Sequence, residues 1–151
     1  MDNGESIESI SLRVIKKIAK IPELQHLPFH DLESIPLGRL RKNATRLHAV
    51  CRYKRGVKKS NGVTPSDVRC IDVHPYALIE EWERYAEFLL YHEYLHALGF
   101  SNHGREFRNM ESLWPDKEVQ QMGNEFSKYI RKKSPIWLWV CDTCNIRYTR
   151  S

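Results

Sequence analysis

The chain has 151 residues, of which 41% are hydrophobic and 28% are charged, and its formal net charge is +5 at pH 7. This length suits one domain with a small appendage, and the apolar content excludes global disorder. No apolar run approaches the ~20 residues that span a bilayer, and the acidic start MDNGESIESI lacks the order of a secretory signal. We therefore expect an intracellular protein without a membrane partner, in the cytoplasm or nucleoid, or in the nucleus if the source is eukaryotic.

The first half of the chain predicts one helix and one β-hairpin. Isoleucine and valine recur at helical spacing over residues 6–20, which indicates an amphipathic helix, and prolines between residues 22 and 36 mark an irregular connection. Residues 45–54 alternate as a strand does, and Val68–Val73 form a second short strand. A turn centred near residues 60–62 would join the two as an antiparallel hairpin.

The second half predicts helices and a tail. Apolar residues recur at i, i+3, i+4 and i+7 spacing from Leu78, and Gly99 suits the left-handed residue that ends such a helix. A short helix is expected over 104–113, and another begins at Pro115 and runs to about residue 130. The predicted fold class is α+β: a domain of residues 1–130 whose hairpin packs on the long helix, then a basic, aromatic, strand-like tail of residues 131–151.

The stretch HEYLHALGFSNHGREF, residues 92–107, carries the chemistry. His92 and His96 lie one turn apart on one helix face, and His103 follows a glycine, so three imidazoles can hold one zinc ion. Three protein ligands leave a fourth position for water, as in catalytic rather than structural zinc sites. Glu93 is then the expected general base. The alternative is a pair of core histidines that hydrogen-bond to backbone carbonyls.

Charge is unevenly distributed along the chain. Residues 39–59 hold nine Lys or Arg and no acid, whereas residues 60–130 hold twelve acids and six bases. Basic segments with interleaved aromatic residues fit contacts to nucleic-acid phosphates and bases, but they also occur as ordinary solvated faces. The candidate nucleic-acid-binding residues are Arg39, Arg41, Lys42, Arg52, Lys54, Arg55, Lys58, Lys59, Arg131, Lys132, Lys133, Trp137, Trp139 and Arg147.

Four cysteines are candidates for a second zinc ion, which would be structural. Cys141 and Cys144 have the spacing of half a zinc ribbon, which needs two further ligands. Cys51 and Cys70 are the candidates, because a turn near residues 60–62 makes them face each other across the hairpin. They could equally be small buried hydrophobic residues. A redox role for the CxxC pair is disfavoured, since no thioredoxin-like βαβ pattern surrounds it.

Three segments resemble the SprT-like, or Spartan, family of zinc metalloproteases, over roughly residues 39–113. RLHAVCRY resembles the family's first strand, CIDVHPYAL its next strand and turn, and HEYLHALGFSNHGREF its helix with an H-G-x-x-F closure. The resemblance implies a small zincin-like protease domain. It carries the family's zinc ligands to His92, His96 and His103, and its catalytic glutamate to Glu93.

The same resemblance implies a substrate and a partner. Family members cleave proteins bound or crosslinked to DNA, as in crosslink repair, so the expected function is a zinc-dependent endopeptidase with single-stranded or discontinuous DNA as partner. The family's ribbon-like part, which contacts DNA, matches the tail with Trp137 and Trp139. One cysteine pair stands there where the family has two, which leaves the second zinc open.

Two other functions fit the same residues. A zinc hydrolase of nucleotides or other phosphoanhydrides would use the same motif, and the basic segments suit phosphate. A non-catalytic, zinc-containing DNA-binding module is the third possibility, but a closed zinc site has no use for Glu93. For a peptidase, the residues close enough in sequence to stabilise the oxyanion are Arg105, Tyr91 and Tyr94, and those that could orient a histidine are Asn102 and Glu106.

Overall fold

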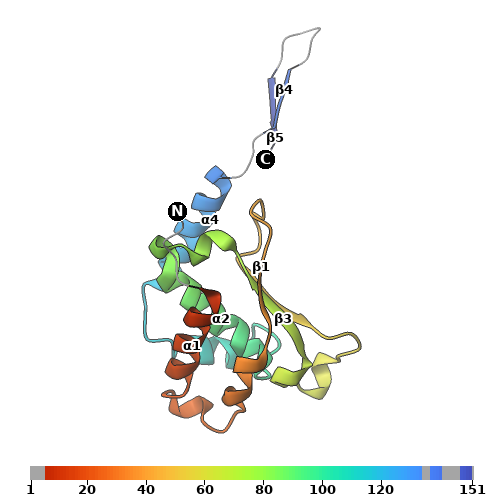
Figure 1. The fold of residues 1–151 in the computed structure, drawn as a ribbon, viewed down its shortest axis with the longest axis vertical. Coiled ribbons are helices and arrows are strands. Elements are labelled where there is room, and N and C mark those ends of the chain that lie inside the picture. The colour runs from red at the N-terminus through yellow and green to blue at the C-terminus, as the bar shows by residue number, and fades with distance from the viewer. Residues whose placement is uncertain (1–5, 134–136, 141–146, 151) are drawn as a thin grey trace.

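The computed structural model describes residues 6–133, 137–140 and 147–150 (Figure 1). Helix α1 spans Ile7–Ile18, as the sequence predicts, and the Ser6 hydroxyl caps it by accepting a hydrogen bond from Ser9 N–H at 3.2 Å. Ile7, Ile10, Val14 and Ile18 are buried against the rest of the domain, and Ile15 is partly buried. Within the described ranges, no helix combines the length and the apolar character that crossing a membrane requires.

A three-stranded sheet has the order β1-β3-β2, so β1 and β2 are its edges. β2 (Ala49–Tyr53) and β3 (Val68–Val73) are antiparallel, which confirms the predicted hairpin. The sequence does not predict β1 (Leu37–Arg39), which is parallel to β3. A strand of three residues is too short to show alternation, and its pairing depends on a partner about thirty residues away along the chain.

The register of the hairpin differs by one residue from the expected one. Cys51 lies opposite Ile71 and Cys70 opposite Arg52, so the prediction that the two cysteines face each other is wrong. The register shifts between Arg52 and Tyr53, and the connection contains two short 3₁₀ turns, which move the centre of the hairpin. Because successive strand residues point to opposite faces, the two cysteines lie on opposite faces of the sheet.

Helix α2 spans Glu83–Ala97 and begins later than the sequence predicts. Ile79 is extended (φ −78°, ψ 157°) and separates two short 3₁₀ turns, Pro75–Leu78 and Glu80–Trp82, from which α2 continues. Gly99 has φ 115°, which confirms its predicted role in ending the helix. A non-glycine residue would be strained in this left-handed conformation.

Helix α3 spans Arg105–Glu111, and α4 spans Val119–Lys133. The short helix is confirmed, but α4 begins after the expected Pro115. Asp116 holds the preceding turn instead, because its carboxylate accepts hydrogen bonds from Arg84 at 2.7 Å and from Glu118 N–H at 3.1 Å. Beyond α4, β4 (Trp137–Val140) and β5 (Arg147–Arg150) pair antiparallel, which confirms a strand-like tail.

Helix α2 is the centre of the domain. It contacts α1, α3, α4, β2 and β3, and Figure 1 shows α1 beside it. Lys17 of α1 pairs with Glu87 of α2 at 2.8 Å, and Arg13 pairs with Glu83. Most residues of α2 are buried against these neighbouring elements. Close packing therefore restricts the movement of the helix that carries the histidine motif. The domain is α+β, as predicted.

Candidate metal centre

The three predicted histidines converge. His92 and His96 lie on α2, and His103 lies in the loop between α2 and α3. The Nε2 atom of His103 is 3.2 Å from Nε2 of His92 and 3.2 Å from Nε2 of His96. Tetrahedral metal–nitrogen bonds of about 2.0–2.1 Å would place ligand nitrogens about 3.3 Å apart. The three side chains can therefore hold one metal ion, as the sequence predicts.

The other ring nitrogens of the two helical histidines have acceptors. Nδ1 of His92 is 2.6 Å from a Glu111 carboxylate oxygen, and Nδ1 of His96 is 2.8 Å from the carbonyl oxygen of Phe100. An N–H at Nδ1 leaves the lone pair at Nε2, where the metal would bind. Burial lowers the pKa of His96 to about 4, so this ring is neutral and can act as a ligand at neutral pH.

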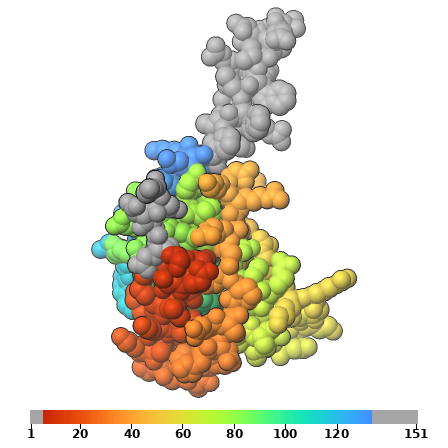
Figure 2. Space-filling view, in the orientation of Figure 1, coloured from red at the N-terminus to blue at the C-terminus, as the bar shows by residue number. Residues whose placement is uncertain are grey.

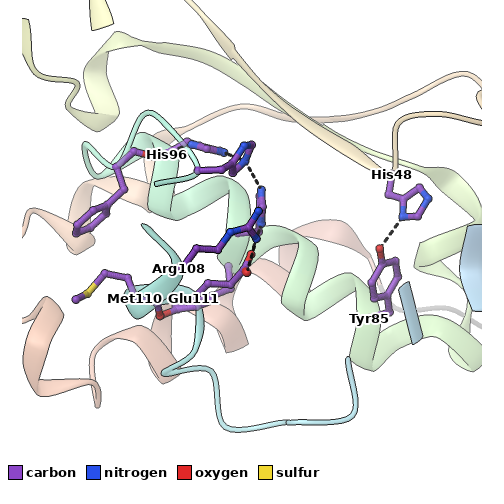
Figure 3. A network of polar contacts seen from close by, with 10 residues as sticks. His48, Tyr85, His96, Arg108, Met110 and Glu111 are labelled. Atoms are coloured by element: carbon purple, nitrogen blue, oxygen red, sulfur yellow. Dashed lines mark hydrogen bonds and ion pairs between the residues drawn. The ribbon is translucent and has the colours of Figure 1, made fainter. Parts of the chain in front are cut away.

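Glu111 is a candidate site residue that the sequence did not predict. Its carboxylate links His92 to Arg108, whose guanidinium donates to the other carboxylate oxygen at 3.2 Å (Figure 3). Asn102 and Glu106, which were expected to orient a histidine, have other surroundings. The Asn102 side chain accepts a hydrogen bond from Gly104 N–H at 2.9 Å, and Glu106 is exposed. Phe107 and Glu111 have i, i+4 spacing on the predicted short helix, so they share one face of it. That spacing is the sequence feature that could have indicated Glu111 as a neighbour of the histidines.

The ring of Phe107 packs against the imidazoles of all three histidines. Its ring centroid lies 4.8 Å from that of His92, 4.7 Å from His96 and 5.0 Å from His103, and its side chain is 1% exposed. The His96 contact is stacked, and the other two are edge-on. The phenylalanine of the H-G-x-x-F closure therefore limits the rotations of each candidate ligand.

Glu93 is 7% exposed, on the helix that carries both histidines. Burial raises its pKa to about 7, while the nearby His92 and the backbone N–H of Cys51 act in the opposite direction. A bound cation would favour the ionised form further. The residue expected as general base thus lies beside the histidines and next to the edge strand β2.

Two cavities meet at His92 and Glu93. The larger, about 560 Å³, extends over α2 and α4, and the smaller, about 290 Å³, extends along β2 toward Lys59 and Ser101. Ala49, His92 and Glu93 line both. Since β2 is an edge strand, the two cavities form an open path across the centre, parallel to that edge.

The candidate oxyanion-stabilising residues are not at the centre. The Tyr91 hydroxyl donates to the carbonyl oxygen of Met110 at 2.5 Å, and the Tyr94 hydroxyl lies 2.6 Å from that of Ser11; both rings are fully buried. Arg105 is exposed at the start of α3. Tyr91, next to the motif, and Tyr94, within it, therefore point into the core, because neighbouring helical residues face different directions.

The remaining predicted residues are spread over the molecule. Cys51 lines the smaller cavity with the histidines, Cys70 lies on the other face of the sheet, and Cys141 and Cys144 fall outside the described residues. Trp137, Trp139 and Arg147 belong to β4 and β5, and Arg131, Lys132 and Lys133 form the last turn of α4. Arg39 is the last residue of β1, and Arg41 and Lys42 follow it. Arg52 pairs with Asp72 at 2.7 Å. The β2–β3 connection contains Lys54, Arg55, Lys58 and Lys59.

Comparison of the chain with protein-family models, with curated proteins and with solved structures gave no match.

Replacing Glu111 by alanine is expected to weaken Zn²⁺ binding by about 10–100-fold, because His92 loses the acceptor that fixes its ring. Competition against a chromophoric chelator measures this change. Glu106→Ala, on the same helix but exposed, is the matched control and should bind as tightly as wild type. Equal affinities for both variants would show that Glu111 does not orient the ligand.

Proposed function

We propose that this protein is a zinc-dependent endopeptidase with a zincin-like fold that acts on DNA-associated proteins, as its resemblance to the SprT-like family implies. The observation that carries the proposal is the position of Glu93, a buried carboxylate that lines both cavities, the smaller of which is also lined by all three histidines. A carboxylate beside a three-histidine centre suits hydrolysis, whereas a closed structural zinc site excludes water and needs no base.

Zinc in this centre would polarise a carbonyl and lower the pKa of a water molecule toward ~7. Glu93 takes the proton of the attacking water and passes it to the leaving amine, which is general base and then general acid catalysis. Glu111 and the Phe100 carbonyl keep His92 and His96 oriented throughout.

The edge strand β2 supports a polypeptide substrate. Ala49, Val50, Cys51 and Tyr53 line the path past the histidines. An extended peptide can add to an exposed sheet edge through main-chain hydrogen bonds, with its side chains in flanking pockets. Because a cavity lies on each side of Glu93, the substrate polypeptide can extend in both directions from the cleaved bond. This arrangement favours an endopeptidase over an exopeptidase.

The connection between β2 and β3 supports a nucleic-acid partner. It carries Lys54, Arg55, Lys58 and Lys59, and Figure 2 shows this yellow segment projecting from the body of the domain. Lys59 also lines the smaller cavity. Phosphate bound along this connection would hold DNA, and any protein attached to it, next to the metal centre.

Arg46 and Arg108 line the larger cavity beside His92, and they favour phosphoanhydride hydrolysis as a second candidate function. Guanidinium groups recognise phosphate oxygens well. Arg108, however, already pairs with Glu111 at 3.2 Å, so less of its charge is available to a substrate.

The deciding experiment incubates the zinc-loaded protein with a basic DNA-binding protein, with and without single-stranded DNA, and identifies fragments by mass spectrometry. Proteolysis stimulated by DNA is the expected result. Nucleotide release without proteolysis would support the second candidate, and DNA binding without any turnover would support a non-catalytic zinc module.

DNA binding through the β2–β3 connection makes a salt-dependent prediction. Lys54→Gln combined with Lys58→Gln should reduce the slope of log K against log[salt] for single-stranded DNA by about 1.4, because two phosphate contacts are lost. Fluorescence anisotropy over a salt titration measures it. Lys16→Gln with Lys20→Gln, two exposed lysines near the end of α1, is the control and should leave the slope unchanged. An unchanged slope in the first variant would remove this connection from the DNA site.

A further inference from the structure

We propose that Tyr53 is a catalytic residue of this centre: its phenol O–H donates a hydrogen bond to the oxygen of the scissile carbonyl as that oxygen gains negative charge, and Lys59 positions its ring. The inference rests on the proposed peptidase function. Tyr53 would then stabilise the oxyanion, the role for which the sequence offers Arg105, Tyr91 and Tyr94. The hydroxyls of Tyr91 and Tyr94 form contacts in the core, which excludes these two residues from that role.

The smaller cavity limits the choice of donor. All three histidines and Glu93 line it, so it is the space in which a carbonyl would meet the metal and the base. Three other lining side chains carry an O–H or N–H donor: Tyr53, Lys59 and Ser101. A donor for the developing charge must come from such a group or from the backbone.

Tyr53 is the donor that the fold holds most firmly. It is half-buried at the end of β2, whereas Lys59 is exposed and Ser101 lies in the loop before His103. The register shift in β2–β3 leaves Arg69 as an extra residue, so Tyr53 lies opposite the buried Val68. Alternation along β2 places Tyr53 on the same face as Cys51, packed against the core, and fixed donors stabilise charge better than mobile ones.

Lys59 covers the ring of Tyr53. Its Nζ lies 4.9 Å from the ring centroid, a cation–π contact that restrains the phenol from the solvent side. The group that interacts with the hydroxyl is the Cys51 thiol, two residues away on the same face of β2. Sulfur is a weak acceptor, so this contact can yield to a carbonyl oxygen that becomes charged.

The proton balance is simple. Tyr53 keeps its proton and only shares it, while Glu93 carries the proton from the attacking water to the leaving nitrogen. The C–N bond breaks, the C–O bond from water forms, and no bond to the protein is made.

Tyr53→Phe, which removes only the hydroxyl, tests the proposal in two ways. In Co²⁺-substituted protein, the visible spectrum reports binding of dimethylphosphinate, an oxyanion, and its Kd should rise about tenfold in the variant. With a peptide substrate, kcat should fall by at least tenfold while KM changes less than about threefold. Tyr76→Phe, a tyrosine stacked on His74 outside both cavities, is the matched control and should change neither quantity.

Lys59 needs a separate readout, because it acts through Tyr53. Lys59→Met should lower kcat in the same direction with little change in KM, and Lys59→Arg, which keeps a cation over the ring, should restore it. A variant that changes KM alone would show that Lys59 binds substrate and does not position the phenol.

The outcomes separate this proposal from the proposed function. If wild type cleaves protein but Tyr53→Phe leaves kcat and the phosphinate Kd unchanged, Tyr53 is not the donor and the peptidase stands. If wild type cleaves nothing but the phosphinate Kd rises in the variant, the donor assignment stands and the peptidase does not. If the phosphinate leaves the wild-type cobalt spectrum unchanged, no oxyanion position exists beside the histidines and the Tyr53 proposal is overturned.

Discussion

Glu93→Gln is expected to lower the rate of peptide-bond cleavage by about 10²–10⁴-fold, the usual contribution of a general base. Glutamine has nearly the same shape and keeps an oxygen for the Cys51 backbone N–H, but it cannot accept the proton of the attacking water. The loss should therefore appear in kcat, with KM nearly unchanged. Single-turnover cleavage of the DNA-binding protein substrate measures it.

Metal content separates a lost base from a lost centre. The candidate ligands are the three histidines, and Glu93 is not among them. Glu93→Gln should therefore retain one zinc ion per histidine site, as measured by mass spectrometry. Glu106→Gln, an exposed carboxylate on α3, is the matched control and should keep full activity. Equal turnover by Glu93→Gln and wild type, at equal zinc content, would refute the assignment of the base.

The same variant has a consequence for stability in the metal-free protein. Burial raises the pKa of Glu93 to about 7, so the folded state binds a proton that the unfolded state releases near pH 4.5. The contribution of Glu93 to wild-type stability should therefore decrease as pH rises from about 4.5 to 7, because ionised Glu93 is poorly solvated in the fold. Glu93→Gln lacks this titration and should be more stable than wild type above pH 7 by about 1–3 kcal/mol. Urea unfolding at pH 5 and pH 8 measures the difference.

The sequence predicts the ligands of the metal centre because their geometry is local. An i, i+4 pair on a helix faces one way whatever surrounds it, and Gly99 with φ 115° allows the chain to return to His103. The hairpin and α1 follow from periodicity for the same reason. The spacing of the three histidines and the periodicity within each helix or strand are all local in the sequence.

Features that depend on contacts between distant segments escaped prediction. β1 forms only by pairing with β3, and the one-residue error in the hairpin arose from a register shift that alternation does not reveal. Glu111 reaches His92 because α3 folds back over α2, a turn whose angle no local pattern specifies. Tyr91 and Tyr94 were candidates by sequence distance, yet α1 and α3 cover them. Proximity along a buried helix is therefore a poor guide to what lines a site.

Phe107→Ala is expected to destabilise the metal-free protein by about 3–5 kcal/mol, because it removes a ring that is 1% exposed and leaves a cavity. This is a large part of the roughly 5–15 kcal/mol that holds a domain folded. Urea unfolding at low temperature measures it. The ring also packs on His92, His96 and His103, so its loss should weaken Zn²⁺ binding as well.

Phe126→Ala is the matched control for the second effect. Phe126 is fully buried and packs on Trp82, Tyr85 and the His48 ring, away from the candidate ligands. Both variants should lose similar stability, because each removes the same buried ring. Only Phe107→Ala should also bind zinc more weakly in a chelator competition at a temperature where both variants remain folded, since freed imidazoles must be ordered when they bind the ion. Equal zinc affinity in the two variants would mean that α2 and the acceptors of Nδ1 alone hold the histidines in place.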